Sequence, residues 1–405
     1  MISLFTGGFL SDPCPLELSF NHCSAKCAFC FANLTVPDRT VDMKKVMSQI
    51  QRHQDSPTLV ARLLRDKYPI LISNRVDPFA KSNYQQAVPV MRVLTDLGIP
   101  YAIASRGGDG VDEVLSFAPR MVWYLSINQD QENIRKRIEP GGTTIESRVQ
   151  LCEKLAKLGH VVHIGFNPYV PEWWEDFPGF ARRLKDAGAT GAYFQRIHIN
   201  PKQRKNMTAK EIEAMGPVMK QAMNFKTYDY VPLQEAAVVA KDIGFHVYVP
   251  DLSSKSELDR DYRAVYDRVF PTNSDFVDWS LANIPASFPI LSFADYCNVL
   301  APSFPTGRFT LREYVGSASR QLLLDHTFNQ GTFEDLLRIV WMEPEMRQSP
   351  IKLQEYSWAG RAEDPQEIFV DEQDQPYMIF SPDGFKDDED IVESRQYFPM
   401  NGGHV

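Results

Sequence analysis

The chain has 405 residues, of which 43% are hydrophobic and 12% aromatic, so it can bury a sizeable core, and its formal net charge is −9. Six cysteines in this length are too sparse for a secreted disulfide scaffold. The N-terminus also lacks the features of a signal peptide, and no apolar run approaches the roughly 18 residues of a membrane span. We therefore expect a cytoplasmic protein with reduced thiols and no membrane partner.

Short apolar runs alternate with helical patterns through the first half of the chain. The predicted strands are residues 15–20, 68–73, 100–105, 121–127, 160–166 and 191–199. Residues 143–159 carry a 3.6-residue apolar period, and Gly159 and Gly188 stand where left-handed helix ends are expected. Six such units predict a parallel α/β sheet, either doubly wound or curled into a barrel, and periodicity does not choose between the two.

Beyond residue 222 the alternation fades. Residues 231–250 predict one more helix and strand, 263–345 mainly helices, and 367–380 a β-hairpin. Residues 1–222 carry 28 Lys+Arg against 22 Asp+Glu, whereas residues 223–405 carry 15 against 30. We therefore predict two domains, 1–222 and an acidic C-terminal extension, 223–405. Only the first has a charge balance suited to a phosphate backbone.

Three of the six cysteines, Cys23, Cys27 and Cys30, follow the first predicted strand in a C-x3-C-x2-C spacing. Thiols clustered in this way predict metal ligands. A structural zinc needs four ligands, and Cys14 or His22 is available as the fourth, but neither completes a paired C-x2-C pattern. A [4Fe–4S] cluster held by three cysteines leaves one iron open, and that iron can chelate the amino and carboxylate groups of S-adenosylmethionine. The spacing favours the cluster over zinc.

With Phe29 as the aromatic before its last cysteine, this loop resembles that of the radical S-adenosylmethionine (SAM) superfamily. The segments "YLSINQDQENIRKRIEPGGTTIESR" (124–148), "NPYVPEWWEDF" (167–177) and "SNRVDPF" (73–79) resemble the spore photoproduct lyase group within it. The match covers about residues 15–200. It implies a partial (β/α)6 TIM-type barrel, with the cluster and SAM at the C-terminal ends of the strands. One electron from the cluster would then cleave SAM to a 5′-deoxyadenosyl radical.

The resemblance also implies a set of contacts to SAM. The cofactor-binding candidates are, in chain order, Phe29, Asn74, Asp77, Ser105, Arg106, Ser126 and Asn128. Of these, Asn74 and Asp77 are candidates for the methionyl amino group. Plainer roles stay open, because Asp77 before Pro78 also suits a turn and Ser105 also suits a cap.

The chain departs from the lyase pattern at the hydrogen-atom donor. Spore photoproduct lyases use a cysteine on the second strand, assisted by tyrosines, whereas this chain has Ser73 there and Phe31 after the last cluster cysteine. A serine O–H bond is too strong to replace a thiol. Of the other cysteines, Cys14 should lie at the closed end of a barrel and Cys152 in the core, while Cys297 is a candidate radical relay. Without a donor, the chemistry expected is isomerisation or regeneration of the adenosyl radical, not reversal of a thymine dimer.

On the substrate side, Arg196 and His198 of the sixth predicted strand are the catalytic candidates, suited to hold a phosphate or carboxylate. A salt-bridged arginine and a core histidine are the alternatives. Tyr169, Trp173 and Trp174 suit either stacking on an extruded base or packing in the core.

The predicted function is that of a radical SAM enzyme, of lyase or isomerase type, acting on a nucleobase. The expected substrate is a modified thymidine in DNA or as a nucleotide, as in bacteriophage-type isomerisation of amino-acid-modified thymidine. Such an enzyme needs an external one-electron reductant such as flavodoxin or ferredoxin. The alternatives are a radical SAM enzyme for a small metabolite or peptide, and a zinc-stabilised, non-enzymic binding module. The sequence does not indicate an oligomeric state.

Overall fold

The computed structural model describes residues 5–6, 13–21, 23–30, 41–199, 201–223, 229–250, 252–253, 255–283, 290–291, 293–303, 337, 356–358 and 378–380. The chain divides into two compact units. The first comprises residues 1–5, 14–251 and 256–269, and the second residues 6–13, 252–255 and 270–405. Within the described residues, no helix is long and apolar enough to cross a membrane.

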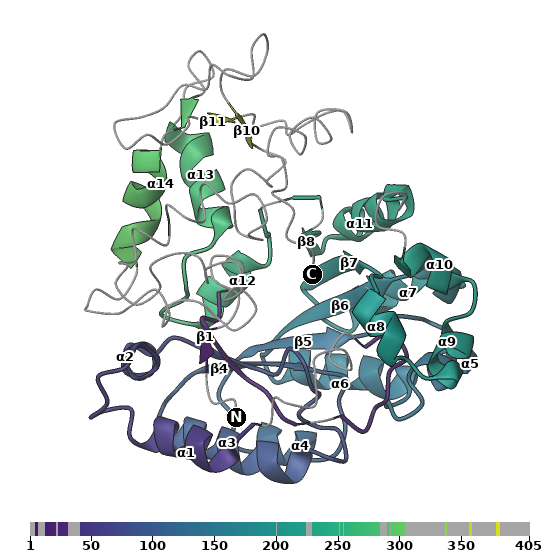
Figure 1. Cartoon of the computed structure of the whole chain (residues 1–405), viewed down its shortest axis with the longest axis horizontal. Helices are drawn as coiled ribbons and strands as arrows, with labels where there is room; N and C mark the ends of the chain where they lie inside the picture. Colours follow the sequence, from purple (N-terminus) through teal and green to yellow (C-terminus); the bar gives the residue numbers. More distant parts are fainter. Residues whose placement is uncertain are drawn as a thin grey trace. The chain divides into compact units, whose positions relative to one another are not determined.

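An open parallel sheet forms the centre of the first unit (Figure 1). Its strands are β1 (Phe5–Thr6), β2 (Leu16–Leu18), β3 (Ile70–Ile72), β4 (Tyr101–Ser105), β5 (Val122–Ser126), β6 (Val161–Tyr169), β7 (Gly191–Arg196) and β8 (His246–Tyr248). From β2 to β8 each strand pairs in parallel with its neighbour in sequence. This order identifies a singly wound barrel and excludes the doubly wound alternative. Among the described strands β8 does not pair back to β1, so the predicted partial TIM-type barrel is confirmed.

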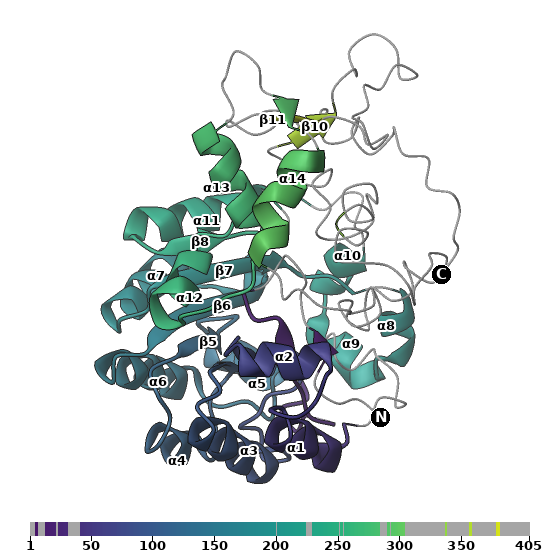
Figure 2. The same cartoon turned by 90° about the vertical axis from the view of Figure 1, so that its left-hand side faces the viewer.

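Helices connect the strands of this sheet. They are α1 (Met43–Gln51), α2 (Leu59–Arg65), α3 (Tyr84–Asp96), α4 (Val111–Leu115), α5 (Glu132–Ile138), α6 (Ile145–Lys157), α7 (Phe177–Asp186), α8 (Pro201–Asn206), α9 (Ala209–Met215), α10 (Val218–Met223), α11 (Val231–Ile243) and α12 (Asp259–Val265). Figures 1 and 2 show α3, α4, α6, α7 and α11 on the outer side of the curved sheet. The helix predicted at 143–159 is α6, which begins where the Thr144 hydroxyl accepts from the Ser147 amide. The left-handed glycines Gly159 (φ 84°) and Gly188 (φ 96°) are also confirmed.

The parallel sheet continues past residue 222, because β8 pairs with β7 and α11 packs against β7. The helix and strand predicted in 231–250 are thus confirmed. The division of the chain into domains at 222/223 stays a prediction.

The second unit contains α13 (Asn273–Asn283), α14 (Phe293–Leu300) and an antiparallel sheet of β9 (Ile290–Leu291), β10 (Tyr356–Trp358) and β11 (Met378–Phe380). Its described core includes Phe276 and Tyr296, whose rings meet edge to face at 5.0 Å. Of the predicted 367–380 hairpin, only β11 lies within the described residues. Cys297, the candidate radical relay, lies half-buried on α14.

The strand starts of the barrel are joined by the segment that contains α12. The Tyr266 hydroxyl donates to the Tyr101 carbonyl at 2.7 Å and accepts from the Val122 amide at 3.1 Å. The Asp261 carboxylate lies 2.8 Å from His163 Nε2 and 2.9 Å from His246 Nδ1. These contacts fix the end of the barrel at which the strands start. Parallel barrels place their active sites at the other end, where the strands end.

Candidate active site

The cysteine loop follows β2 and is bound to the end of α5. The Ala28 amide donates to the Ile138 carbonyl at 2.8 Å, and the Gly141 amide donates to the Ala25 carbonyl at 3.0 Å. A Cβ on Gly141 would lie 2.3 Å from the Ser24 carbonyl oxygen, so only glycine permits this close approach. The "EPGGT" segment therefore packs against the backbone of the cysteine loop and fixes its position.

The three thiols of the loop lie in different surroundings. Cys27 is buried, whereas Cys23 and Cys30 are half-buried, and none forms a disulfide. Burial raises the pKa of the Cys27 thiol well above its usual range; Arg106 opposes this, while Glu139, Cys30 and Cys23 add to it. Burial and then Asp77 likewise raise the pKa of Cys23. In the part of the chain that the structure describes, no group of three or more His, Cys, Asp or Glu side chains is close enough together to hold a single metal ion.

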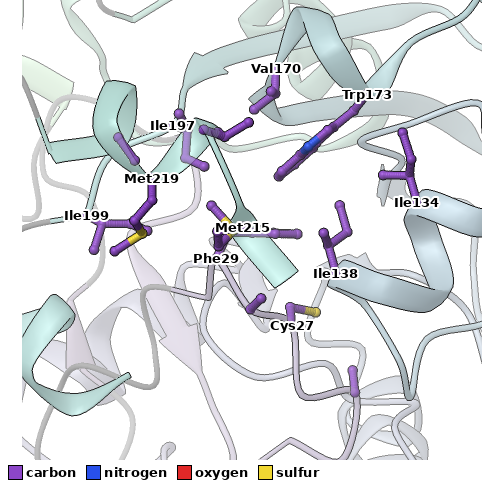
Figure 3. Close-up of a cluster of buried hydrophobic side chains, with 14 residues drawn as sticks. Cys27, Phe29, Ile134, Ile138, Val170, Trp173, Ile197, Ile199, Met215 and Met219 are labelled. Atoms are coloured by element: carbon purple, nitrogen blue, oxygen red, sulfur yellow. The ribbon is translucent and has the colours of Figure 1, made fainter. Parts of the chain in front are cut away.

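An apolar cluster packs behind the cysteine loop (Figure 3). Its buried members include Cys27, Phe29, Ile134, Ile138, Val170, Trp173, Ile197, Ile199, Met215 and Met219. The Phe29 ring lies 5.6 Å from the Trp173 ring, and α5 contributes Ile134 and Ile138. The candidate Phe29 is thus part of the apolar cluster that excludes water from the inner side of the loop.

Three of the cofactor candidates meet between the ends of β3 and β4. The buried Asp77 carboxylate accepts from the Ser105 hydroxyl at 2.7 Å and from the Arg106 amide at 2.8 Å. The same carboxylate accepts from the Phe79 amide at 3.0 Å, as expected of a turn former. Asp77 therefore fixes the loop that follows β4, which we call the β4 loop. A pocket of about 270 Å³ opens between residues 106–112 of this loop and α4 on one side and residues 143–154 on the other.

Glu139 joins this network to the cysteine loop, and sequence reasoning did not select it. Its carboxylate is completely buried and accepts from Arg106 Nε at 3.0 Å, Arg148 Nη2 at 2.6 Å and Gln129 Nε2 at 3.2 Å. Burial alone would raise the pKa of Glu139, but Arg148 and Arg106 outweigh it and lower the pKa to about 2. The carboxylate stays ionised and holds both guanidinium groups in place. No local pattern marks Glu139, because its partners Arg106 and Arg148 lie 33 and nine residues away in the sequence.

The candidates at the end of β5 belong to the same network. The Ser126 hydroxyl donates to Asn128 Oδ1 at 3.0 Å, and Asn128 Nδ2 donates to the Asn167 carbonyl at 2.7 Å. Arg148 Nη1 donates to the Ser126 carbonyl at 3.1 Å, so Arg148 connects the β5 end to Glu139. The structure thus gathers Asp77, Ser105, Arg106, Ser126 and Asn128 around the carboxyl ends of β3, β4 and β5.

The remaining candidates lie in less defined places. Asn74 is exposed, directly after the buried Ser73. Arg196 and His198 are half-buried, and the Arg196 guanidinium lies 5.3 Å from the centre of the Tyr230 ring. Phe194, which shares the face of Arg196 on β7, packs against Phe177 of α7. A catalytic role for Arg196 and His198 stays a prediction.

Tyr169, Trp173 and Trp174 lie among other aromatic side chains. The Trp174 ring stacks on Tyr169 at 6.1 Å and meets Phe177 edge to face at 5.2 Å. Trp173 is buried against Phe29. These contacts favour packing over base stacking for the three rings.

The described residues also place the side chains considered as hydrogen-atom donors. The buried Ser73 hydroxyl donates to the Ser19 hydroxyl at 3.1 Å, and Phe31 lies outside the described residues. Cys152 is completely buried on α6, 3.8 Å from the Ala187 carbonyl oxygen, and burial raises its pKa to about 12. Cys14 is buried close enough to Tyr266 to affect the pKa of that phenol, at the end where strands start. Both placements agree with the expectations for these cysteines.

No protein-family model matches the sequence, and no curated protein matches it. Similar solved structures include a spore photoproduct lyase complexed with dinucleoside spore photoproduct, which is 13% identical, with a TM-score of 0.41 over 58% of this chain and 76% of that one. Streptococcus suis SuiB bound to S-adenosylmethionine is 14% identical, with a TM-score of 0.39 over 60% and 53%. Methylornithine synthase is 11% identical, with a TM-score of 0.33 over 61% and 72%.

Replacing Glu139 with glutamine should destabilise the protein by about 3–5 kcal/mol, because Arg148 would remain buried without its charge partner. Urea unfolding at about pH 7 measures the loss. Glu146→Gln is the matched control: it removes an ion pair with Arg183 whose side chains are 56% and 48% exposed, and it should leave the midpoint unchanged.

The difference in unfolding free energy between wild type and Glu139→Gln should also depend on pH. The pKa of Glu139 is lowered from 4.5 to about 2 in the folded chain, so its stabilisation is complete above about pH 4.5 and is lost as the pH falls towards 2. The stability gap between wild type and Glu139→Gln should therefore narrow on acidification. A difference in unfolding free energy that is small at neutral pH, or that grows as the pH falls, would contradict the role given to Glu139.

Proposed function

We propose that this chain is a radical SAM enzyme that acts on a nucleobase, and that Cys23, Cys27 and Cys30 hold its [4Fe–4S] cluster. The observation that supports this most directly concerns Glu139. Ile138 and Gly141, which hydrogen-bond the backbone of the cysteine loop, flank Glu139, and the Glu139 carboxylate binds Arg106 at the end of β4. One rigid connection therefore links the metal-binding loop to the candidate cofactor residues.

The number and the chemical type of the donors in the loop are those of a [4Fe–4S] cluster with one open iron. Three thiols stand within eight residues, none forms a disulfide, and two are half-buried and so accessible from outside. When bound, the cluster with SAM supplies a one-electron cleavage that yields a 5′-deoxyadenosyl radical. Because burial raises the pKa of Cys23 and Cys27, their protons must leave when metal binds.

The chain's own residues then bind and orient SAM. Arg106 is held by Glu139 on one side and faces the Phe29 ring at 5.9 Å on the other, so its cationic group stays beside the cysteine loop. Ser126 and Asn128 present polar groups at the neighbouring strand end. Phe29, with the apolar cluster behind it, excludes water from a site where a radical must survive.

The substrate that we propose is a modified thymidine, in DNA or as a nucleotide, and the reaction is an isomerisation. Ser73, which stands where the lyases carry their donor cysteine, holds a hydrogen bond to Ser19 instead. Cys152 and Cys14 lie in the core and at the strand-start end, away from the strand ends that would hold SAM. An isomerisation needs no separate donor, because the product radical recovers the original hydrogen.

Purified without oxygen, the protein should be brown and carry about four iron and four sulfide ions per chain. Alanine at Cys23, Cys27 or Cys30 should abolish the cluster, whereas Cys152→Ala should retain it. Metal and sulfide analysis with absorption spectra decides this. A colourless protein with one bound zinc would instead establish the zinc-stabilised binding module.

Asp77→Asn should weaken SAM binding about tenfold, because the amide cannot accept from both Ser105 and the Arg106 amide as the carboxylate does. Equilibrium dialysis with the cluster-loaded protein measures the dissociation constant, and dithionite-driven formation of 5′-deoxyadenosine gives a second readout. Asp112→Asn, at a side chain that is 83% exposed, is the control. Equal affinities in the two variants would remove Asp77 from the cofactor site.

The reduced enzyme should convert thymidines that carry amino-acyl groups at the 5-methyl carbon and should leave spore-photoproduct DNA unchanged. Mass spectrometry of the nucleosides follows both reactions. With a substrate prepared with deuterium at the abstracted position, the label should return to the product if the reaction is an isomerisation. Repair of the dimer at enzymatic rates, without turnover of the modified nucleosides, would overturn this substrate assignment.

A further inference from the structure

The two faces of β6 and β7 carry different kinds of side chain. On one face, the rings of Phe166 and Phe194 lie 4.9 Å apart, and both meet the Phe177 ring of α7 edge to face, at 5.2 and 6.0 Å. Because α7 lies on the outer side of the curved sheet (Figures 1 and 2), this is the outer face. Successive side chains of a strand point to opposite faces, so Gly165 and Tyr193 lie on the inner face.

Three tyrosines form a continuous row on this inner face. Tyr193 meets Tyr124 of β5 at 5.8 Å and Tyr248 of β8 at 5.7 Å, in both cases edge to face. The row crosses β6 at Gly165, where a Cβ would lie 2.0 Å from the Tyr124 ring, so only glycine lets that ring lie across β6 toward Tyr193. All three tyrosines are half-buried, so part of the row stays accessible.

Gln195 continues the same face toward the carboxyl end of β7, two residues beyond Tyr193. Its side chain is half-buried, and its Oε1 accepts from the Tyr193 hydroxyl at 3.5 Å, a long and weak contact. Its Nε2 group donates no hydrogen bond to any residue that the structure describes. The amide therefore keeps donor and acceptor capacity for a ligand.

The accessible part of this face carries no charge. At the end where the strands start, the Asp261 carboxylate lies between His163 and His246. From there to the carboxyl ends of the strands, the inner-facing residues of β5 and β7 are Tyr124, Ser126, Tyr193 and Gln195. A phosphate or carboxylate in a half-buried place needs a cationic partner, whereas a flat, uncharged ring needs aromatic surface and a few hydrogen bonds. The face therefore suits a neutral ring.

The same face adjoins the candidate cofactor residues. In the register of the sheet Ser126 is paired with Gly165, and Gly165 with Tyr193. Tyr193 thus lies two strand spacings, about 10 Å, from Ser126. A ring held at Tyr193 and Gln195 would therefore lie beside the strand ends at which we propose that SAM binds.

We propose that Gln195 recognises the imide edge of a pyrimidine substrate and that Tyr193 forms the surface on which the ring lies. This inference rests on the proposed function and names the residues that select its substrate. Thymine presents an N3–H donor between two carbonyl acceptors, so one amide can accept from N3–H through Oε1 and donate to a carbonyl through Nε2. Arg196, by contrast, shares the outer face of Phe194, and its guanidinium lies against the Tyr230 ring.

The test compares thymidine with 3-methylthymidine, which lacks the N3–H donor, as ligands of the cluster-loaded protein with SAM. Wild type should bind thymidine at least about tenfold more tightly, because the methyl group leaves Gln195 Oε1 without its donor. Gln195→Met should weaken thymidine binding and bring the ratio of the two affinities close to one. Gln234→Met, at an exposed glutamine of α11, is the matched control and should keep the wild-type ratio. Calorimetry measures the dissociation constants, and urea unfolding checks that each variant folds.

Further arms separate the possible failures. Tyr193→Leu should weaken both nucleosides by a similar factor, because a ring surface does not distinguish the substituent at N3. Equal binding of the two nucleosides to wild type, no binding of either, or a preference that survives in Gln195→Met would overturn the inference. So would a Tyr193→Leu variant that binds both as tightly as wild type. If wild type forms no 5′-deoxyadenosine from SAM with dithionite, the proposed function itself is refuted, whatever the nucleosides do.

Discussion

The buried carboxylate of Glu139, held between Arg106 and Arg148, is the interaction on which the candidate site depends. A charge in so dry a place is tolerated only when opposite charges and hydrogen bonds surround it, and here two guanidinium groups and the Gln129 amide do so. The arrangement gives up conformational freedom in α5, α6 and the β4 loop together. The end of α5, the start of α6 and the loop after β4 therefore have one fixed geometry.

That geometry explains why the cysteine loop lies where it does. Glu139 is covalently next to Ile138 and close to Gly141, the two residues that bind the backbone of the cysteine loop. Anything that moves the carboxylate therefore moves the loop, and with it the cationic group of Arg106. The apolar cluster around Phe29 and Trp173 covers the inner side of the same loop.

Much of this was predictable from residue patterns, and the exceptions have physical causes. The strands at 101–105 and 122–126 had been predicted as 100–105 and 121–127 from runs of β-branched and aromatic residues, because fully buried parallel strands are apolar on both faces. The choice of a barrel came from resemblance, since periodicity does not encode strand order. Glu139 was missed because a salt bridge between residues 139 and 148 and another to residue 106 leaves no local signature. For Arg196, alternation along β7 predicts a shared face with Phe194 but does not say which side of the sheet that face covers.

The most direct test of the account is electron paramagnetic resonance of the reduced, cluster-loaded protein with SAM labelled with nitrogen-15 at the methionyl amino group. The account predicts that SAM changes the cluster signal and that hyperfine coupling to the labelled nitrogen appears, because one iron is left open by the three cysteines. It also predicts that Asp77→Asn weakens this coupling at a fixed SAM concentration. A cluster signal that SAM leaves unchanged, with no coupling to the label in wild type, would contradict the assignment of this loop as a SAM-binding centre.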